Sequence, residues 1–232
     1  FQIDGVTIIG GMSLTTAFLG FIYSISYTTA AVTLFMLALM PFLASLIAFI
    51  FLKEKISKQN FVSMVVAFIG TLVMIYASAF SGSFFGLIMG FISSLGFAAF
   101  SVALRSKSDI KKFYILIYGG LFCALFSAFL MIINNQDFYI PIKNVYLSMT
   151  HGTLVASGLI LFSIGSKQLL SGELTMLSLL EVVGGIFWAW LPILGINEVP
   201  SMNTIIGGAI ICVAIAMNSY RFDKKRLENI TR

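Results

Sequence analysis

The sequence predicts an all-α polytopic membrane protein, and two observations carry that prediction. Residues 5–52 contain no Asp, Glu, Lys or Arg, and at about 20 apolar residues per crossing this stretch is long enough for two spans. Hydrophobic residues make up 59% of the 232-residue chain and charged residues only 10%, whereas soluble domains are about one quarter charged. Because lipid offers backbone groups no partner, we expect the spans to be helical.

Charged gaps and Gly, Pro and Asn residues divide the chain into eight predicted spans. The first two share the uncharged stretch, and each later span begins or ends beside a polar or charged gap. The predicted spans are 6–27, 29–52, 60–79, 84–104, 113–134, 146–166, 173–195 and 203–221.

The basic residues predict the direction of these spans. Gaps after the even-numbered spans and the C-terminal tail carry nearly all the Lys and Arg, whereas the opposite gaps carry only Lys143. By the positive-inside tendency, we expect both chain ends in the cytoplasm. The one-sided pattern also supports the count, because one missed span would scatter the charges over both sides.

Two stretches resemble each other, one within residues 27–54 and one within residues 168–198. In each, small residues precede a long apolar helix that is closed by a glutamate, Glu54 or Glu198. The following span has small residues seven apart, Ser63 and Gly70 in the first copy and Gly207 and Ala214 in the second. Because the two copies cross in opposite directions, they are inverted repeats, as in alternating-access transporters.

These residues make the chain similar to EamA-type members of the drug/metabolite transporter superfamily. The matching elements are Tyr27-Thr-Thr-Ala, Leu39-Met-Pro41, Leu52-Lys-Glu54, Leu180-Glu181, Trp188-Ala-Trp190, Glu198-Val-Pro-Ser201 and Ile206-Gly-Gly208. The resemblance implies a ten-helix fold of two inverted five-helix repeats around a central cavity. Residues 1–80 then hold the last three helices of the first repeat, without its first two. Residues 81–222 form the second repeat, and 223–232 a basic cytoplasmic tail.

Glu181 is the leading candidate site residue, because it is the one acid or base well inside a predicted span. A carboxylate there is costly unless it is neutralised or partnered, so we expect it to face the bundle and act as a proton carrier or a counter-ion. The alternative is a structural hydrogen bond to a neighbouring helix. Trp188 lies seven residues further on the same face, with Gly184 and Gly185 between them, which would admit a cationic or aromatic ligand. Alternatively, Trp188 belongs to an interfacial aromatic belt.

Three more residues are candidates for a moving part. Pro41 removes a backbone hydrogen bond in the middle of its span and is either a hinge or a static kink. Glu54 and Glu198 close the repeated helices and are either gate contacts or solvated interfacial residues. Val182 stands where the family pattern usually has proline, which leaves the geometry of the seventh span open.

The predicted function is secondary transport of small organic metabolites, such as amino acids or S-adenosylmethionine-like solutes, across a bacterial inner membrane. The alternatives are a drug or metabolite efflux pump and a truncated, non-transporting scaffold or degenerate copy. No catalytic constellation, cofactor motif or metal-ligand cluster is evident, so we expect neither an enzyme nor a metal or cofactor site. The expected partners are a small-molecule substrate and the lipid bilayer, not nucleic acid, and a homodimer is left open.

Overall fold

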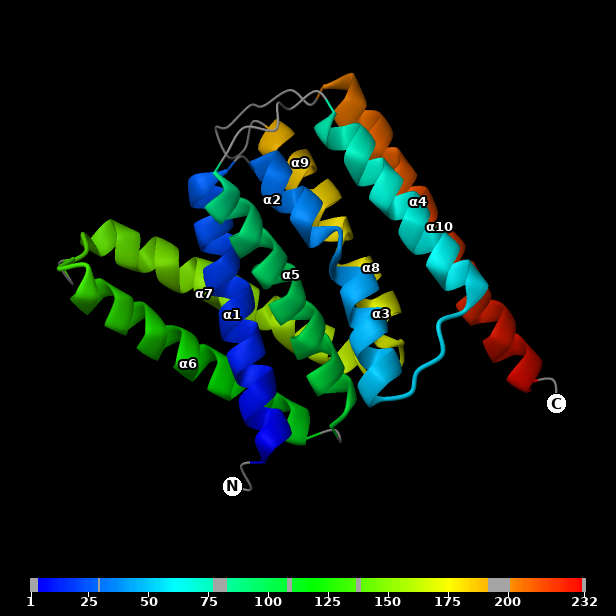
Figure 1. The fold of residues 1–232 in the computed structure, drawn as a ribbon, viewed down its shortest axis with the longest axis horizontal. Helices are drawn as coiled ribbons and strands as arrows, with labels where there is room; N and C mark the ends of the chain where they lie inside the picture. The colour runs from blue at the N-terminus through cyan, green and yellow to red at the C-terminus, as the bar shows by residue number, and fades with distance from the viewer. Residues whose placement is uncertain are drawn as a thin grey trace.

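The computed structural model describes residues 4–28, 30–76, 83–107, 110–136, 139–191 and 201–230, and all regular elements in these ranges are helices (Figure 1). In chain order they are α1 (Gly5–Tyr27), α2 (Ala30–Leu37), α3 (Met40–Phe51), α4 (Lys58–Ile75), α5 (Phe84–Arg105), α6 (Lys111–Ile133), α7 (Ile142–Gly165), α8 (Ser171–Leu177), α9 (Leu180–Trp190) and α10 (Met202–Ile230).

The prediction of an all-helical polytopic membrane protein is confirmed. Within the described residues, six helical stretches are long and apolar enough to cross a membrane, and they coincide with predicted spans. A seventh, α4, has a shorter apolar stretch, Lys58–Met74. The seventh predicted span, 173–195, appears as α8 followed by α9 over its described residues, which end at residue 191. Helix α10 continues to Ile230, so part of the predicted tail is helical, as its Lys, Arg, Leu and Glu residues favour.

Polar side chains fix where several helices begin. Asp4, Ser57 and Ser83 precede α1, α4 and α5, and each accepts a hydrogen bond from a backbone N–H of the first turn. The first turn of a helix leaves its N–H groups without helical partners, and these side chains satisfy one of them.

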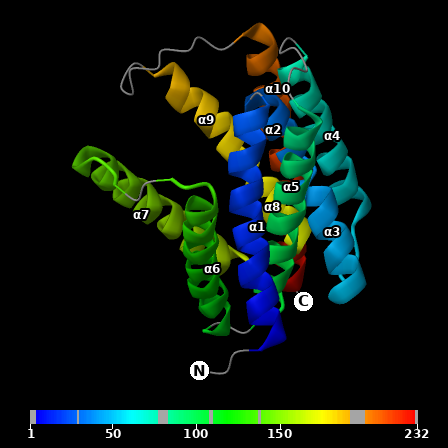
Figure 2. The same ribbon diagram turned by 60° about the vertical axis from the view of Figure 1, so that its left-hand side comes forward.

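Helix α1 packs against α5 and α6, while α4 packs along α10 on the other side of the molecule (Figures 1 and 2). Between these pairs, α3 contacts α8. Hydroxyl groups join the first set, because Ser93 donates to the carbonyl of Ala17 at 2.8 Å and Thr15 to that of Gly119 at 3.1 Å. Such interhelical hydrogen bonds help to hold helices together in lipid, where burial of apolar surface cannot.

The closest approach of α4 and α10 occurs at two glycines. A Cβ atom placed on Gly207 would lie 2.5 Å from the carbonyl oxygen of Gly70, and one on Gly70 would lie 2.9 Å from that of Gly207. Only residues without side chains permit backbones to come so near. The repeat comparison singled out both glycines as small residues, although at different positions of the repeat: Gly70 corresponds to Ala214, and Gly207 to Ser63.

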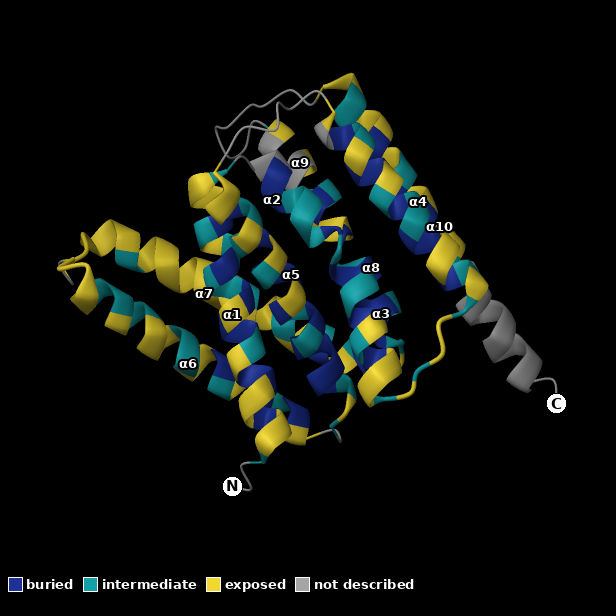
Figure 3. Cartoon of the chain, in the orientation of Figure 1, coloured by how far each residue is buried: buried dark blue, intermediate teal, exposed yellow. Residues whose placement is uncertain are grey.

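Helices α6 and α7 form an antiparallel arm that projects from the rest (Figures 1 and 3). In the most apolar 18-residue window of each helix, 6% of the residues of α7 and 11% of those of α6 are buried, compared with 56% of those of α5. Apolar side chains on this arm are therefore available to lipid. The start of α1, the loop after α3 and the end of α5 all lie toward the lower edge of Figure 1. This arrangement agrees with basic gaps on one side, while the side that faces the cytoplasm stays a prediction.

Candidate functional site

The two repeated spans are both interrupted at corresponding points. The first is divided into α2 and α3 by Ala38 and Leu39, and the second into α8 and α9 by Ser178 and Leu179. The second half of each span thus begins one residue before Pro41 or before Glu181. Paired discontinuous helices mark the binding region in transporters built from inverted repeats.

Proline explains the first interruption. Pro41 has no N–H, so the carbonyl of Leu37 loses the partner that a continuous helix would supply. Within the interruption, Leu39 donates to the carbonyl of Met36, three residues back in the tighter pattern, while the N–H of Ala38 is shared between the carbonyls of Leu34 at 3.1 Å and Phe35 at 3.2 Å. Ser94 of α5 also donates to the carbonyl of Met36, and this bond holds the end of α2 against α5.

The second interruption forms without proline. The N–H of Glu181 donates to the carbonyl of Ser178 at 2.9 Å, and that of Val182 to Leu179 at 3.1 Å. Because the N–H of Glu181 bonds to the carbonyl three residues back and not four, the carbonyl of Leu177 does not receive the hydrogen bond of a continuous helix. The carbonyl of Leu37 lacks the same bond in the first span. The valine at position 182 therefore does not remove the break in the seventh span.

The two interruptions lie in one buried core. Ala38 and Leu179 are 2% and 1% exposed and belong to the same hydrophobic cluster as Met176 of α8. The cluster also includes Met64 of α4 and Ile211 of α10. The ends of the four half-helices therefore lie around one apolar core. There, the C-terminal ends of α2 and α8 present carbonyl groups, and the N-terminal ends of α3 and α9 present N–H groups.

Glu181 lies in the first turn of α9, where the helix dipole stabilises a carboxylate. Within the described residues, Glu181 is exposed and its neighbour Val182 is buried, and the expectation that its carboxylate faces the bundle stays a prediction. No described residue donates a hydrogen bond to its carboxylate. The carboxylate is thus accessible halfway along an interrupted span, directly beside the break.

The other predicted site residues have mixed outcomes. No atom lies within 4 Å of a Cβ built on Gly184, so among the described residues it faces open space and no neighbouring helix packs against it. Gly185 and Trp188 are on the α9 backbone, but their side-chain positions lie outside what the structure describes, as does the whole of Glu198. The proposed roles of these residues stay predictions.

Glu54 forms an ion-pair network in place of a solvated helix end. Its Oε1 lies 2.7 Å from Nε of Arg105, and its Oε2 accepts the N–H of Ser171 at 3.1 Å. Arg105 also donates through Nη1 to the carbonyls of Ser166 and Lys167, at 3.0 and 2.6 Å. The network therefore connects the end of α3, the end of α5 and the segment that leads into α8.

Sequence analysis missed the role of Arg105, which it used only as a topological charge. The available signal was that Glu54 is the one acid in a gap with three lysines, Lys53, Lys55 and Lys58. Its partner could not be inferred, because Arg105 is distant in sequence. Glu173 performs a local role, since its Oε2 accepts the N–H of Leu170 at 3.1 Å before the first turn of α8.

Comparison with known proteins shows what this chain is similar to. Residues 5–76, which include α1, the interrupted α2–α3 span and α4, match the model of the EamA-like transporter family. Over this stretch, which is less than half of the chain, the protein is similar to the EamA-like transporter family.

The chain is also similar to two curated proteins, the pseudopaline exporters CntI of Pseudomonas aeruginosa strains PAO1 and UCBPP-PA14. Each is 26% identical over 200 residues, which cover 84% of this chain and 67% of the exporter. A solved structure titled "Crystal structure of protein" matches 98% of the chain and 79% of its own length, with a TM-score of 0.71 and 19% identity. That match concerns the fold alone.

Together, the family and the exporter similarity support a membrane transporter of small metabolites. In this chain, the family match includes the first interruption, and the second lies beyond its end at residue 76. Among the described residues, no group of three or more His, Cys, Asp or Glu side chains is placed to hold a metal ion.

Proposed function

We propose that this protein is a secondary transporter that moves small zwitterionic metabolites across a bacterial inner membrane by alternating access. The paired interruptions of the two repeated spans carry the proposal. Ala38 and Leu179 bring both breaks into one buried cluster, and a substrate that contacts both breaks contacts both repeats. Motion of one repeat against the other then changes the side from which the substrate is reached.

The chemistry at the breaks supports an amino-acid-like substrate. Half-helix C-termini present partial negative charge and half-helix N-termini partial positive charge. Carbonyls at the ends of α2 and α8, together with the carboxylate of Glu181, suit an ammonium group. The N-terminal turns of α3 and α9 suit a carboxylate. Amino acids and S-adenosylmethionine-like solutes carry both groups, so they are the proposed cargo.

The proposed direction is export. The named activity of both curated relatives is export, and the sequence alone allowed either direction. Glu181 supplies the coupling in this proposal, because protonation of an accessible carboxylate beside the break removes its charge and releases a bound ammonium group. A proton gradient then drives the cycle.

Counterflow in proteoliposomes tests this function. Vesicles are preloaded with one unlabelled amino acid or S-adenosylmethionine and then given the same labelled compound outside. Labelled uptake above that of protein-free liposomes is expected for at least one zwitterion. If folded protein exchanges none of the panel, the proposed substrate class is wrong and a non-transporting scaffold is favoured.

Glu181→Gln tests the coupling residue, with Glu173→Gln as its matched control. Both variants remove one carboxylate from the same interrupted span, but the amide at 173 can still accept the N–H of Leu170. We expect Glu181→Gln to remove the pH dependence of exchange and Glu173→Gln to retain it. Equal pH profiles in the wild type and Glu181→Gln would contradict the assigned role.

A further inference from the structure

The inverted repeat makes two pairs of half-helices equivalent, and the structure packs these pairs differently. Helix α2 corresponds to α8 and α3 to α9, so the contact of α3 with α8 has its counterpart in α2 and α9. Helix α3 packs along α8. Among the described residues, α2 and α9 make no comparable contact, and α9 diverges from α2 toward its C-terminal end (Figure 2). The two repeated spans are therefore closed together at one end and apart at the other.

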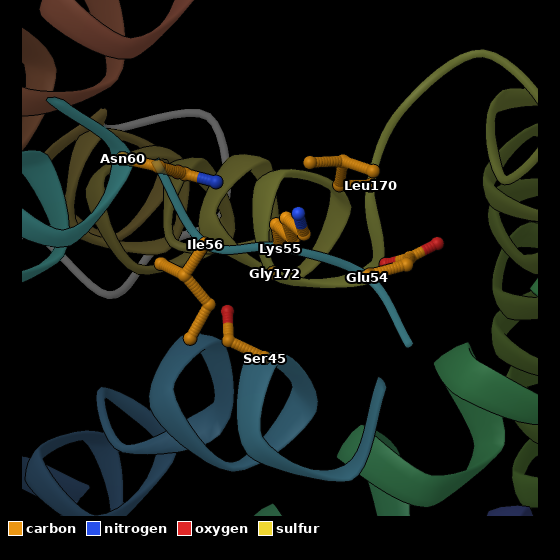
Figure 4. A pocket seen from close by; sticks show the side chains of 7 residues that line it. All are labelled: Ser45, Glu54, Lys55, Ile56, Asn60, Leu170 and Gly172. Carbon is orange, nitrogen blue, oxygen red and sulfur yellow. The ribbon is translucent and has the colours of Figure 1, made fainter. Parts of the chain in front are cut away.

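A glycine in each half of the second repeated span shows the same difference. A Cβ atom placed on Gly172 of α8 would overlap the Oγ atom of Ser45 of α3. On Gly184 of α9, the same atom would have no described neighbour within 4 Å. The boundary between Ser45 and Glu54 on the α3 side and Leu170 and Gly172 on the α8 side is called the α3–α8 seam (Figure 4).

The seam is held by hydrogen bonds that cross between the repeats and end on Glu54. Its two carboxylate oxygens accept from Nε of Arg105, at 2.7 Å, and from the N–H of Ser171, at 3.1 Å. Both donors belong to the second repeat, and Arg105 is also bonded within that repeat, to the carbonyls of Ser166 and Lys167. Separation of α3 from α8 therefore requires one carboxylate to release two donors, while Arg105 keeps its bonds to the carbonyls.

The seam lies between the breaks and one face of the membrane. Glu54 follows α3 and Ser171 begins α8, whereas the breaks at Ala38 and Leu179 lie at the opposite ends of these two helices. A substrate at the breaks is therefore blocked on the seam side by the packed α3 and α8. On the other side, Glu181 is exposed in the first turn of α9.

We infer that Glu54 is the gate residue of the α3–α8 seam. Its bonds to Arg105 and Ser171 close this end, and the structure is the state that is closed at the seam and open beside Glu181. The inference rests on the proposed transport by alternating access, and it adds the residue that controls one of the two ends. The substrate reaches the breaks from the seam side only after Glu54 has released the second repeat.

Cysteine accessibility tests the gate without any substrate. In nanodiscs, with the natural Cys123 and Cys212 replaced by alanine, Ser171→Cys reports on the seam and is labelled with a water-soluble methanethiosulfonate. Ser63→Cys is the matched reporter, because both serines are 0% exposed and neither hydroxyl has a hydrogen-bond partner among the described residues. Ser63 lies seven residues before Gly70, on the face of α4 that packs against α10 and away from the seam.

Glu54→Gln should raise the labelling rate at position 171 about tenfold, because labelling proceeds through the fraction of molecules that are open at the seam. The rate at position 63 should stay that of the protein with Glu54. Equal increases at both positions would show general loosening and overturn the gate, and so would an unchanged rate at 171. Glu173→Gln is the control variant, since its carboxylate bonds only within the second repeat, to the N–H of Leu170. A tenfold increase at 171 in that variant would also overturn the assignment to Glu54.

A reversible cross-link tests the same gate in the opposite direction. Glu54→Cys and Ser171→Cys are combined and bridged with a short bis-methanethiosulfonate, which should stop counterflow until the bridge is reduced. Because reduction restores the same molecules, the result does not depend on a folding defect. Normal counterflow with the bridge intact would overturn the gate. Selective labelling at 171 without counterflow of any tested zwitterion would retain the gate and refute the proposed substrate class, whereas counterflow without selective labelling would refute the gate alone.

Discussion

The ion pair between Glu54 and Arg105 can be measured by a double-mutant cycle. A charge-assisted hydrogen bond contributes about 1.5–3 kcal/mol when it is buried, and an exposed ion pair about 0–1 kcal/mol. The Arg105 and Glu54 side chains are 24% and 14% exposed, so we expect an intermediate coupling of about 1–2 kcal/mol. The cycle compares wild type, Glu54→Gln, Arg105→Gln and the double variant.

Arg105→Gln should be the more destabilising single change, because it also removes the donor to the carbonyls of Ser166 and Lys167. Its expected cost is about 2–4 kcal/mol, whereas Glu54→Gln keeps an acceptor for Ser171. Free energies of unfolding are measured by denaturant titration in mild detergent. Coupling indistinguishable from zero would refute the network, and equal costs for the two single variants would refute the role of the carbonyl contacts.

Three further predictions follow from other contacts. Gly207→Ala should destabilise the protein by about 1–3 kcal/mol, because its Cβ would meet the backbone of α4. Gly158 faces open space, so Gly158→Ala should leave the stability unchanged. Equal unfolding midpoints for the two variants would show that α4 and α10 do not meet at Gly207. Hydrogen bonds from Lys107 and Thr7 hold the pKa of Asp4 below its ordinary value of 3.8. The ionised Asp4 therefore stabilises the fold above that pH, and this stabilisation is lost on acidification. The difference in unfolding midpoint between wild type and Asp4→Asn should shrink below about pH 4, and a larger difference at low pH would contradict this role. Pro41→Ala supplies an N–H for the carbonyl of Leu37, so we expect slower counterflow with unchanged stability, and a normal rate would show that Pro41 is a static kink.

The number and positions of the spans followed from the sequence because apolar length and charged gaps are local properties. The interruption at Pro41 was similarly accessible, since a proline removes a hydrogen bond wherever it lies in a helix. The interruption before Glu181 was not, because neither Ser178 nor Leu179 is a residue that breaks helices by itself. Tertiary packing of the second repeat against the first determines it.

The sequence also did not reveal which residues distant in the chain contact each other. The glycines at 70 and 207 were both recognised as small residues of the two repeats, but their direct contact depends on how α4 and α10 cross. The engagement of Glu54 by Arg105 was hidden for the same reason, and the sequence left a gate contact and a solvated interfacial residue open as alternatives for Glu54. The exposure of Glu181 could not be inferred from the sequence, because it depends on the break before α9, and the role of Glu181 stays a prediction.

The packing of α1 has a consequence for biosynthesis. Within the described residues, α1 lies against α5 and α6, and the end of α2 is held by Ser94 of α5. The contacts of α1 and α2 with α5 can therefore form only after α5 has been translated and inserted, whereas α4 meets its main neighbour, α10, later still. A ribosome stalled before residue 84 would release a protease-sensitive set of helices, and completion of α5 should mark the onset of protection.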